Sequence, residues 1–142
     1  MRRIRDIKTM DLFEVPVPTA PLPGALNFGL VLRNLLSDQL KQSDKSRVDI
    51  AIRMSELTGE TITKHQLDSW TAESREGWRF PLEYMPAFEA ALETHAIGAW
   101  LADIRGGKLL VGREAIDAEI GRLERIREAT MKRIRELKQE AE

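Results

Sequence analysis

The sequence predicts an all-α protein: a small helical bundle containing a helix-turn-helix, with an extended proline-rich N-terminal arm and a long C-terminal, coiled-coil-like helix. Three observations support this class. Prolines cluster near the N-terminus, apolar residues recur at helical spacing through the middle, and the last thirty residues contain no proline. A chain of 142 residues has room for one core of ordinary size with extensions. We therefore expect an arm over residues 1–26, a helical domain over 27–110 and an oligomerisation helix over 113–142.

The arm is defined by four of the six prolines, Pro16, Pro18, Pro21 and Pro23. Each proline fixes φ and lacks an amide hydrogen, so this stretch favours an extended, polyproline-like backbone over a helix. Two interpretations stay open. The arm is either an inert tether or packed extended segment, which is the favoured interpretation, or a docking motif for a protein partner.

The first helix is predicted over residues 27–42, where apolar residues recur at three- and four-residue steps. This spacing places them on one helical face, which is expected to pack inward. Its members are Phe28, Val31, Leu32, Leu35, Leu36 and Leu40.

The second helix has clear start and stop signals. Ser46 and Asp49 have the spacing of a capping box. Gly59 follows the last expected helical residue, the position at which a glycine commonly forms a left-handed C-terminal cap. We expect the helix to end near residue 58. Its inner face comprises Ile50, Ala51, Met54 and Leu57.

The third helix is predicted to begin at Thr63. Thr63 and Gln66 form a second capping box, while Ile62 and Leu67 stand at the positions of a hydrophobic staple. Leu67 and Trp70 should be buried together. The second and third helices then form a helix-turn-helix unit over residues 46–74.

Two shorter helices should follow, because Pro81 and Pro86 suit the first turn of a helix and Gly106 and Gly107 suit its end. The first should run to about Thr94, and the second from Ala96 to Arg105. Their inward faces are Met85, Phe88, Ala91 and Leu92, and then Ile97, Trp100, Leu101 and Ile104.

The last helix carries an apolar stripe between charged faces, since residues 113–142 hold eight basic and eight acidic residues. Alternate steps of four and three define eight seam positions of a heptad repeat. Arg127 and Thr130 occupy two of them, and Ile126 and Met131 widen the stripe beside them. A partner helix is needed, but register and partner number stay open. The candidate oligomerisation residues are Ile116, Ile120, Leu123, Ile134 and Leu137, with Ala141 at the last seam position.

The composition argues against an enzyme. The chain has no cysteine and two histidines, His65 and His95, thirty residues apart, with no His-x-x-x-His pair and no carboxylate cluster of ligand spacing. We expect no catalytic residue, metal site or cofactor. There is also no signal peptide or apolar run of membrane-spanning length, so we expect a soluble protein of the cytoplasm.

The third helix is the candidate DNA-reading helix. In a helix-turn-helix, the first turn of the second helix points at base edges in the major groove. On that geometry Lys64 and His65 are the outermost donors, and Asp68 and Ser69 follow one turn later. The expected phosphate contacts nearby are Arg47, Arg53, Arg75 and Arg79.

Two features favour the opposite interpretation, in which these helices are only part of a bundle. Residues 46–70 hold three basic and four acidic residues, and the whole chain has a net charge of -1. The turn is also long, because Gly59 lies eight residues after Ala51, whereas the compact motif places its glycine four residues after its small residue.

Five stretches of the chain carry a family resemblance, namely 47–59, 62–70, 84–88, 96–101 and 106–110. They resemble small helix-turn-helix regulatory proteins of temperate and transposable (Mu-like) phages, including the CII-like kind. The resemblance covers roughly residues 27–125 and implies a prophage-encoded DNA-binding protein in a bacterial host cell. It carries over no catalytic residue.

Two functions follow from these patterns. The first is a transcriptional regulator that reads double-stranded DNA with the helix starting at Thr63 and dimerises through its C-terminal helix. The alternative is a protein-interaction adaptor that does not bind DNA and engages a protein partner through that helix and the arm.

Overall fold

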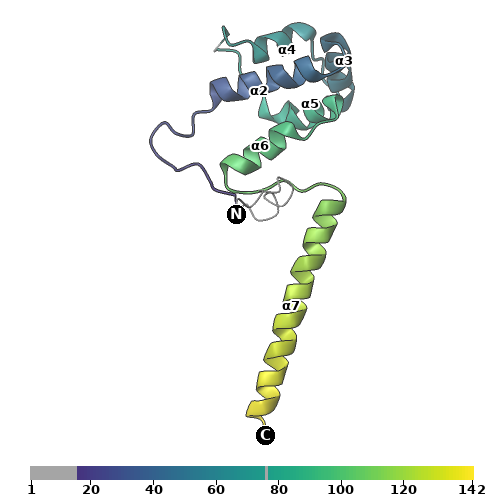
Figure 1. Ribbon diagram of the computed structural model, residues 1–142. Coiled ribbons are helices and arrows are strands. Elements are labelled where there is room, and N and C mark those ends of the chain that lie inside the picture. The colour runs from purple at the N-terminus through teal and green to yellow at the C-terminus, as the bar shows by residue number, and fades with distance from the viewer. Residues whose placement is uncertain (1–15, 76) are drawn as a thin grey trace, which may run out of the picture. The chain divides into compact units, whose positions relative to one another are not determined.

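The computed structural model describes residues 16–75 and 77–142, and all regular structure within these ranges is helical, which confirms the predicted all-α class. Residues 1–15, the first part of the predicted arm, lie outside the described residues. The chain divides into one unit that ends at Lys108 and a second that begins at Leu109. The helices labelled in Figure 1 are α2 (Gly29–Gln42), α3 (Arg47–Thr58), α4 (Lys64–Thr71), α5 (Met85–Leu92), α6 (Ala96–Ile104) and α7 (Arg113–Glu140). A 3-10 helix, η1 (Leu82–Tyr84), directly precedes α5.

The ends of α3 follow the predicted signals. The Asp49 amide donates to the Ser46 hydroxyl oxygen at 3.1 Å, so Ser46 is the N-cap. The Asp49 carboxylate accepts from the Ser46 hydroxyl, at 2.8 Å, and this closes the local loop. At the other end Gly59 has φ 73°, the left-handed conformation that glycine adopts without steric cost.

The start of α4 is a complete capping box. The Gln66 amide donates to the Thr63 hydroxyl at 3.2 Å, and the Thr63 amide donates to Gln66 Oε1 at 2.9 Å. Ile62 and Leu67, the predicted staple residues, are both buried. Two of the amide hydrogens that a helix start leaves without partners are thereby satisfied.

Ser55 holds the turn between α3 and α4. Its hydroxyl oxygen accepts from the Ile62 amide at 2.8 Å and lies 2.8 Å from the Ala51 carbonyl oxygen. The Tyr84 hydroxyl also donates to the Glu60 carboxylate, which links this turn to η1. These contacts explain how a turn longer than that of the compact motif keeps a defined path.

The core of the first unit lies where α3 packs on α4 and α5, and where α2 packs on α4 and α6. Val31 and Leu57, both predicted to face inward, are more than two-fifths exposed. Each lies in a terminal turn of its helix, where neighbouring helices cover less of the surface. The buried apolar residues are Leu36, Leu40, Ile50, Ala51, Met54, Ile62, Leu67, Trp70, Ala87, Phe88, Ala91 and Ile97.

An aromatic cluster fixes the segment between α4 and η1. The Phe80 ring meets Trp70 and Phe88 edge-on, each at a centroid distance of 5.4 Å, and Tyr84 lies 5.9 Å from Trp70. Edge-to-face pairs of this kind add to the stabilisation from buried area. The segment therefore folds back over α4, and this determines which side of α4 is exposed.

The described part of the proline-rich arm packs against the end of α6. The Thr19 amide donates to the Ile104 carbonyl at 2.9 Å. A Cβ placed on Gly106 would lie 2.7 Å from Pro18 Cδ and 2.9 Å from Pro18 N. At Pro18 and Thr19 the arm is therefore packed against the first unit, and the hydrogen bonds from Leu22 to Ala20 and from Ala25 to Leu22 turn the backbone further along.

We expect Gly106→Ala to destabilise the first unit more than Gly59→Ala. Both glycines have positive φ, near 75°, so alanine carries a left-handed penalty of about 1–2 kcal/mol at either position. At Gly59 the added Cβ meets nothing within 4 Å, whereas at Gly106 it overlaps the Pro18 backbone, which adds about 1–3 kcal/mol of overpacking. Urea unfolding of both variants measures the difference. Equal losses would show that the arm does not pack on Gly106 in solution.

Candidate nucleic-acid interface

Helix α4 exposes its first turn and buries most of its second. It packs against α2 and α3, and its buried residues are Leu67, Ser69, Trp70 and Thr71. Lys64 and His65 are exposed, and Asp68 is partly covered. The surface that α4 can offer to a ligand is therefore its N-terminal end.

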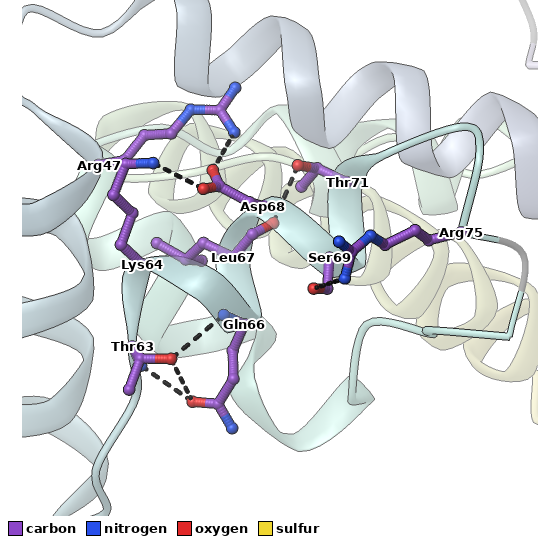
Figure 2. Close-up of polar contacts among 9 residues, drawn as sticks. All are labelled: Arg47, Thr63, Lys64, Gln66, Leu67, Asp68, Ser69, Thr71 and Arg75. Carbon is purple, nitrogen blue, oxygen red and sulfur yellow. Dashed lines mark hydrogen bonds and ion pairs between the residues drawn. The ribbon is translucent and has the colours of Figure 1, made fainter.

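Asp68 binds two of the predicted DNA-contacting cations (Figure 2). Lys64 Nζ lies 2.6 Å from Asp68 Oδ2, and Arg47 Nη1 lies 2.7 Å from Asp68 Oδ1. The first pair joins residues four positions apart on α4, and the second joins α3 to α4. The structure thus brings Lys64, Arg47 and Asp68 together, with one cation on each carboxylate oxygen.

The charge of Asp68 is stabilised by these partners. Partial burial acts to raise its pKa, but the hydrogen bonds from Lys64 and Arg47 outweigh it, and the pKa lies below the ordinary value of 3.8. Asp68 is therefore ionised at neutral pH and leaves this three-residue cluster with a net charge of +1.

We expect Asp68→Asn to lower stability at neutral pH by less than about 1 kcal/mol, because the ion pairs of Asp68 are partly exposed to solvent. A depressed folded-state pKa contributes stability that is present above pH 3.8 and lost as the pH falls through the folded-state pKa. The difference in the free energy of unfolding between the natural chain and the variant should therefore disappear in acid. Urea unfolding at several pH values measures it, and a gap that stays constant with pH would contradict the pairing.

Ser69 does not lie on the exposed side, and the sequence-based expectation is wrong for this residue. It is 1% exposed, and Arg75 Nη1 donates to its hydroxyl oxygen at 3.0 Å. Arg75 belongs to the segment that follows α4, and Phe80 of the same segment packs on Trp70. Ser69 therefore cannot reach a base edge while the segment stays in place, and one guanidinium nitrogen of Arg75 is engaged in holding it.

Trp78 is a neighbour of the exposed turn that the sequence analysis missed. Its ring lies 6.2 Å from the His65 ring, edge-on, and it is almost half exposed. Its backbone carbonyl accepts from the buried Arg33 at 3.4 Å, which ties this segment to α2. The sequence could have indicated this residue, because Trp78 is a large aromatic side chain in an otherwise polar loop between Arg75 and Arg79.

Two further predicted phosphate contacts, Arg53 and Arg79, are exposed. Arg53 pairs with Glu56 on its own helix at 2.9 Å, and both side chains are more than half exposed. Arg79 is exposed in the segment after α4. Among the predicted cations, Lys64 and Arg47 are the two that meet at a common carboxylate, that of Asp68.

The second unit carries the candidate oligomerisation residues. Helix α7 buries none of its residues, and Ile116, Ile120, Leu123, Ile134 and Leu137 are between 41% and 61% exposed. Ile126 and Met131 are exposed in the same way. An exposed apolar stripe of this length is unusual for a monomer.

No group of three or more His, Asp or Glu side chains that could hold a metal ion occurs among the residues described. In the same part of the chain, no helix combines the length and apolarity needed to cross a membrane. Comparisons with protein-family models, with curated proteins and with solved structures find no match to the chain. The similarity to phage regulators therefore stays a prediction from the sequence.

Proposed function

We propose that the protein is a non-enzymatic DNA-binding regulator that places the first turn of α4 in the major groove and associates through α7. The observation that supports this most is the exposure of Lys64 and His65 at the start of a short, box-capped helix. In helix-turn-helix proteins this end of the second helix is the part that contacts base edges.

The chemistry of the exposed turn suits such contacts. A lysine can donate to guanine O6 and N7 or to a phosphate, and histidine can donate to either kind of acceptor. Ser69 is not part of the proposed reading set, because it is buried. The set is Lys64 and His65, with Asp68 able to accept from a cytosine amino group.

The local charge permits an approach to DNA. Asp68 would repel phosphates if it were unpaired, but Arg47 and Lys64 neutralise it. Lys64 is about half exposed, so moving from Asp68 to a DNA acceptor costs only an exposed ion pair, typically below about 1 kcal/mol. Exposed Arg79 and Trp78 lie on the segment after α4 and could contact the sugar-phosphate backbone.

Selection of random DNA duplexes with the full chain tests this proposal. We expect a sequence motif to be enriched at about 50 mM salt and binding to weaken steeply by about 200 mM, since phosphate contacts release counterions. Absence of any enriched motif at the lower salt would count decisively against DNA reading.

The second candidate is an adaptor that binds no DNA, and the ion pairs around Asp68 favour it. In that case Arg47 and Lys64 act as a clamp between α3 and α4. The exposed stripe of α7 then binds a protein. Failure of the duplex selection together with retention of a binding partner through α7 would favour this function.

A further inference from the structure

The seam of α7 is symmetric about the middle of the helix. Its eight positions pair off at equal distances from the point between Glu128 and Ala129. Each apolar seam residue then has an apolar seam residue at the same distance on the other side of this point, and Arg127 has Thr130. The pairs are Ile116 with Ala141, Ile120 with Leu137, Leu123 with Ile134, and Arg127 with Thr130.

Arg127 discriminates between the two ways in which two copies of α7 can pair. In a parallel pair in register, each seam position faces its own copy, so Arg127 would face Arg127 inside the seam. Two guanidinium groups would then repel each other at the point where water is excluded. In an antiparallel pair, Arg127 faces Thr130 of the second copy, whose hydroxyl can accept a hydrogen bond.

The residues beside the seam favour the same orientation. A parallel pair places Glu119 against Glu124 and Arg133 against Lys138, two like-charge contacts on each side. An antiparallel pair places Asp117 against Lys138, an attractive contact. These flanking contacts set orientation in coiled coils.

Two flanking contacts run against this preference, and both are weak. An antiparallel pair places Glu119 near Glu140, but Glu119 already accepts two hydrogen bonds from Arg122, at 2.6 and 2.8 Å. A parallel pair would place Ile126 against Met131 of the second copy, an apolar contact that favours the parallel orientation. In the antiparallel pair, Ile126 instead meets the aliphatic stem of Arg133, which can cover it.

We propose that α7 pairs with α7 of a second copy in antiparallel orientation, with Ile120 opposite Leu137 and Arg127 opposite Thr130. Shifting the antiparallel register by one heptad would place Arg127 opposite Leu123 or Leu137, so Arg127 would lose Thr130 as its hydrogen-bond partner. In the proposed register, the N-terminal ends of the two helices, at Arg113, lie about 46 Å apart along the axis, at 1.5 Å per residue. This inference rests on the self-association in the proposed function and not on DNA binding.

Disulfide cross-linking of the full chain tests the orientation. The natural chain has no cysteine, so each introduced thiol is the only one. We expect Ile120→Cys alone and Leu137→Cys alone to give no linked dimer on oxidation, and an equimolar mixture of the two to give one. In the antiparallel pair, two copies of residue 120 are separated by about 26 Å along the axis, far beyond disulfide reach.

Two further variants sharpen the test. Arg125 lies away from the seam. Arg125→Cys should therefore give no linked dimer, whether it is oxidised alone, mixed with Ile120→Cys or mixed with Leu137→Cys. Adding Arg127→Leu to Ile120→Cys removes the layer that excludes parallel pairing. We therefore expect this double variant to begin linking to itself, an effect that a merely structural role of Arg127 would not produce.

Each other outcome overturns the proposal in a distinct way. Self-linking of Ile120→Cys alone would show a parallel pair. A dimeric mass of the natural chain without linkage in the mixture would show a different register or interface. A monomeric mass in sedimentation, without any linkage, would refute self-association itself but would leave DNA reading to the duplex selection.

Discussion

If α7 pairs as we propose, Leu123→Asp is expected to convert the proposed dimer to a monomer at micromolar concentration. Leu123 lies near the centre of the exposed stripe and would face Ile134 of the second copy. A carboxylate there would lose its hydration without gaining a partner, at a cost of several kcal/mol for each of two copies. Sedimentation velocity measures the mass. Since α7 has no buried residue, loss of its partner should also reduce its helix content, which circular dichroism reports.

Ala118→Asp is the matched control, because it adds the same side chain and charge on an exposed part of α7 outside the seam. This variant should keep the dimeric mass. If Leu123→Asp also keeps the mass of the natural chain, the stripe is not the interface.

Phe88→Ala is expected to lower the free energy of unfolding of the first unit by about 3–5 kcal/mol. Phe88 is 0% exposed and meets Phe80 edge-on, so alanine loses buried area, leaves a cavity and removes an aromatic contact. That is a large part of the 5–15 kcal/mol that a domain typically has. Urea unfolding followed by circular dichroism measures it.

Leu82→Ala, at a position 73% exposed, should change stability by no more than about 0.5 kcal/mol. A loss of below about 1 kcal/mol for Phe88→Ala would mean that the core around α5 is not packed as described.

Local chemistry explains what the sequence could predict. The ends of α3 and the start of α4 depend on side chains within a few residues of each other, such as Ser46 with Asp49 and Thr63 with Gln66. Their hydrogen bonds require no knowledge of the rest of the fold. The pair of Lys64 with Asp68, four positions apart on one helix, is equally local, but the sequence-based prediction assigned both residues to DNA contacts and did not pair them.

Long-range contacts explain what the sequence missed. Helical periodicity placed Ser69 outside, but Arg75, in the segment after α4, contacts its hydroxyl, and Ser69 is buried. Arg47 reaches Asp68 from another helix, across 21 positions of the sequence. No pattern within one helix specifies such a contact, so the exposed surface of α4 proved smaller than its periodicity predicted.

The affinity of the double variant Lys64→Ala/His65→Ala for the duplex selected by the natural chain tests the central claim most directly. We predict at least a tenfold loss, since each base contact is worth about 1–3 kcal/mol. The circular dichroism spectrum should stay unchanged, and Lys108→Ala, which removes one exposed cation at the end of the first unit, should bind as the natural chain does. Affinity within twofold of the natural chain would contradict the claim that the first turn of α4 reads DNA.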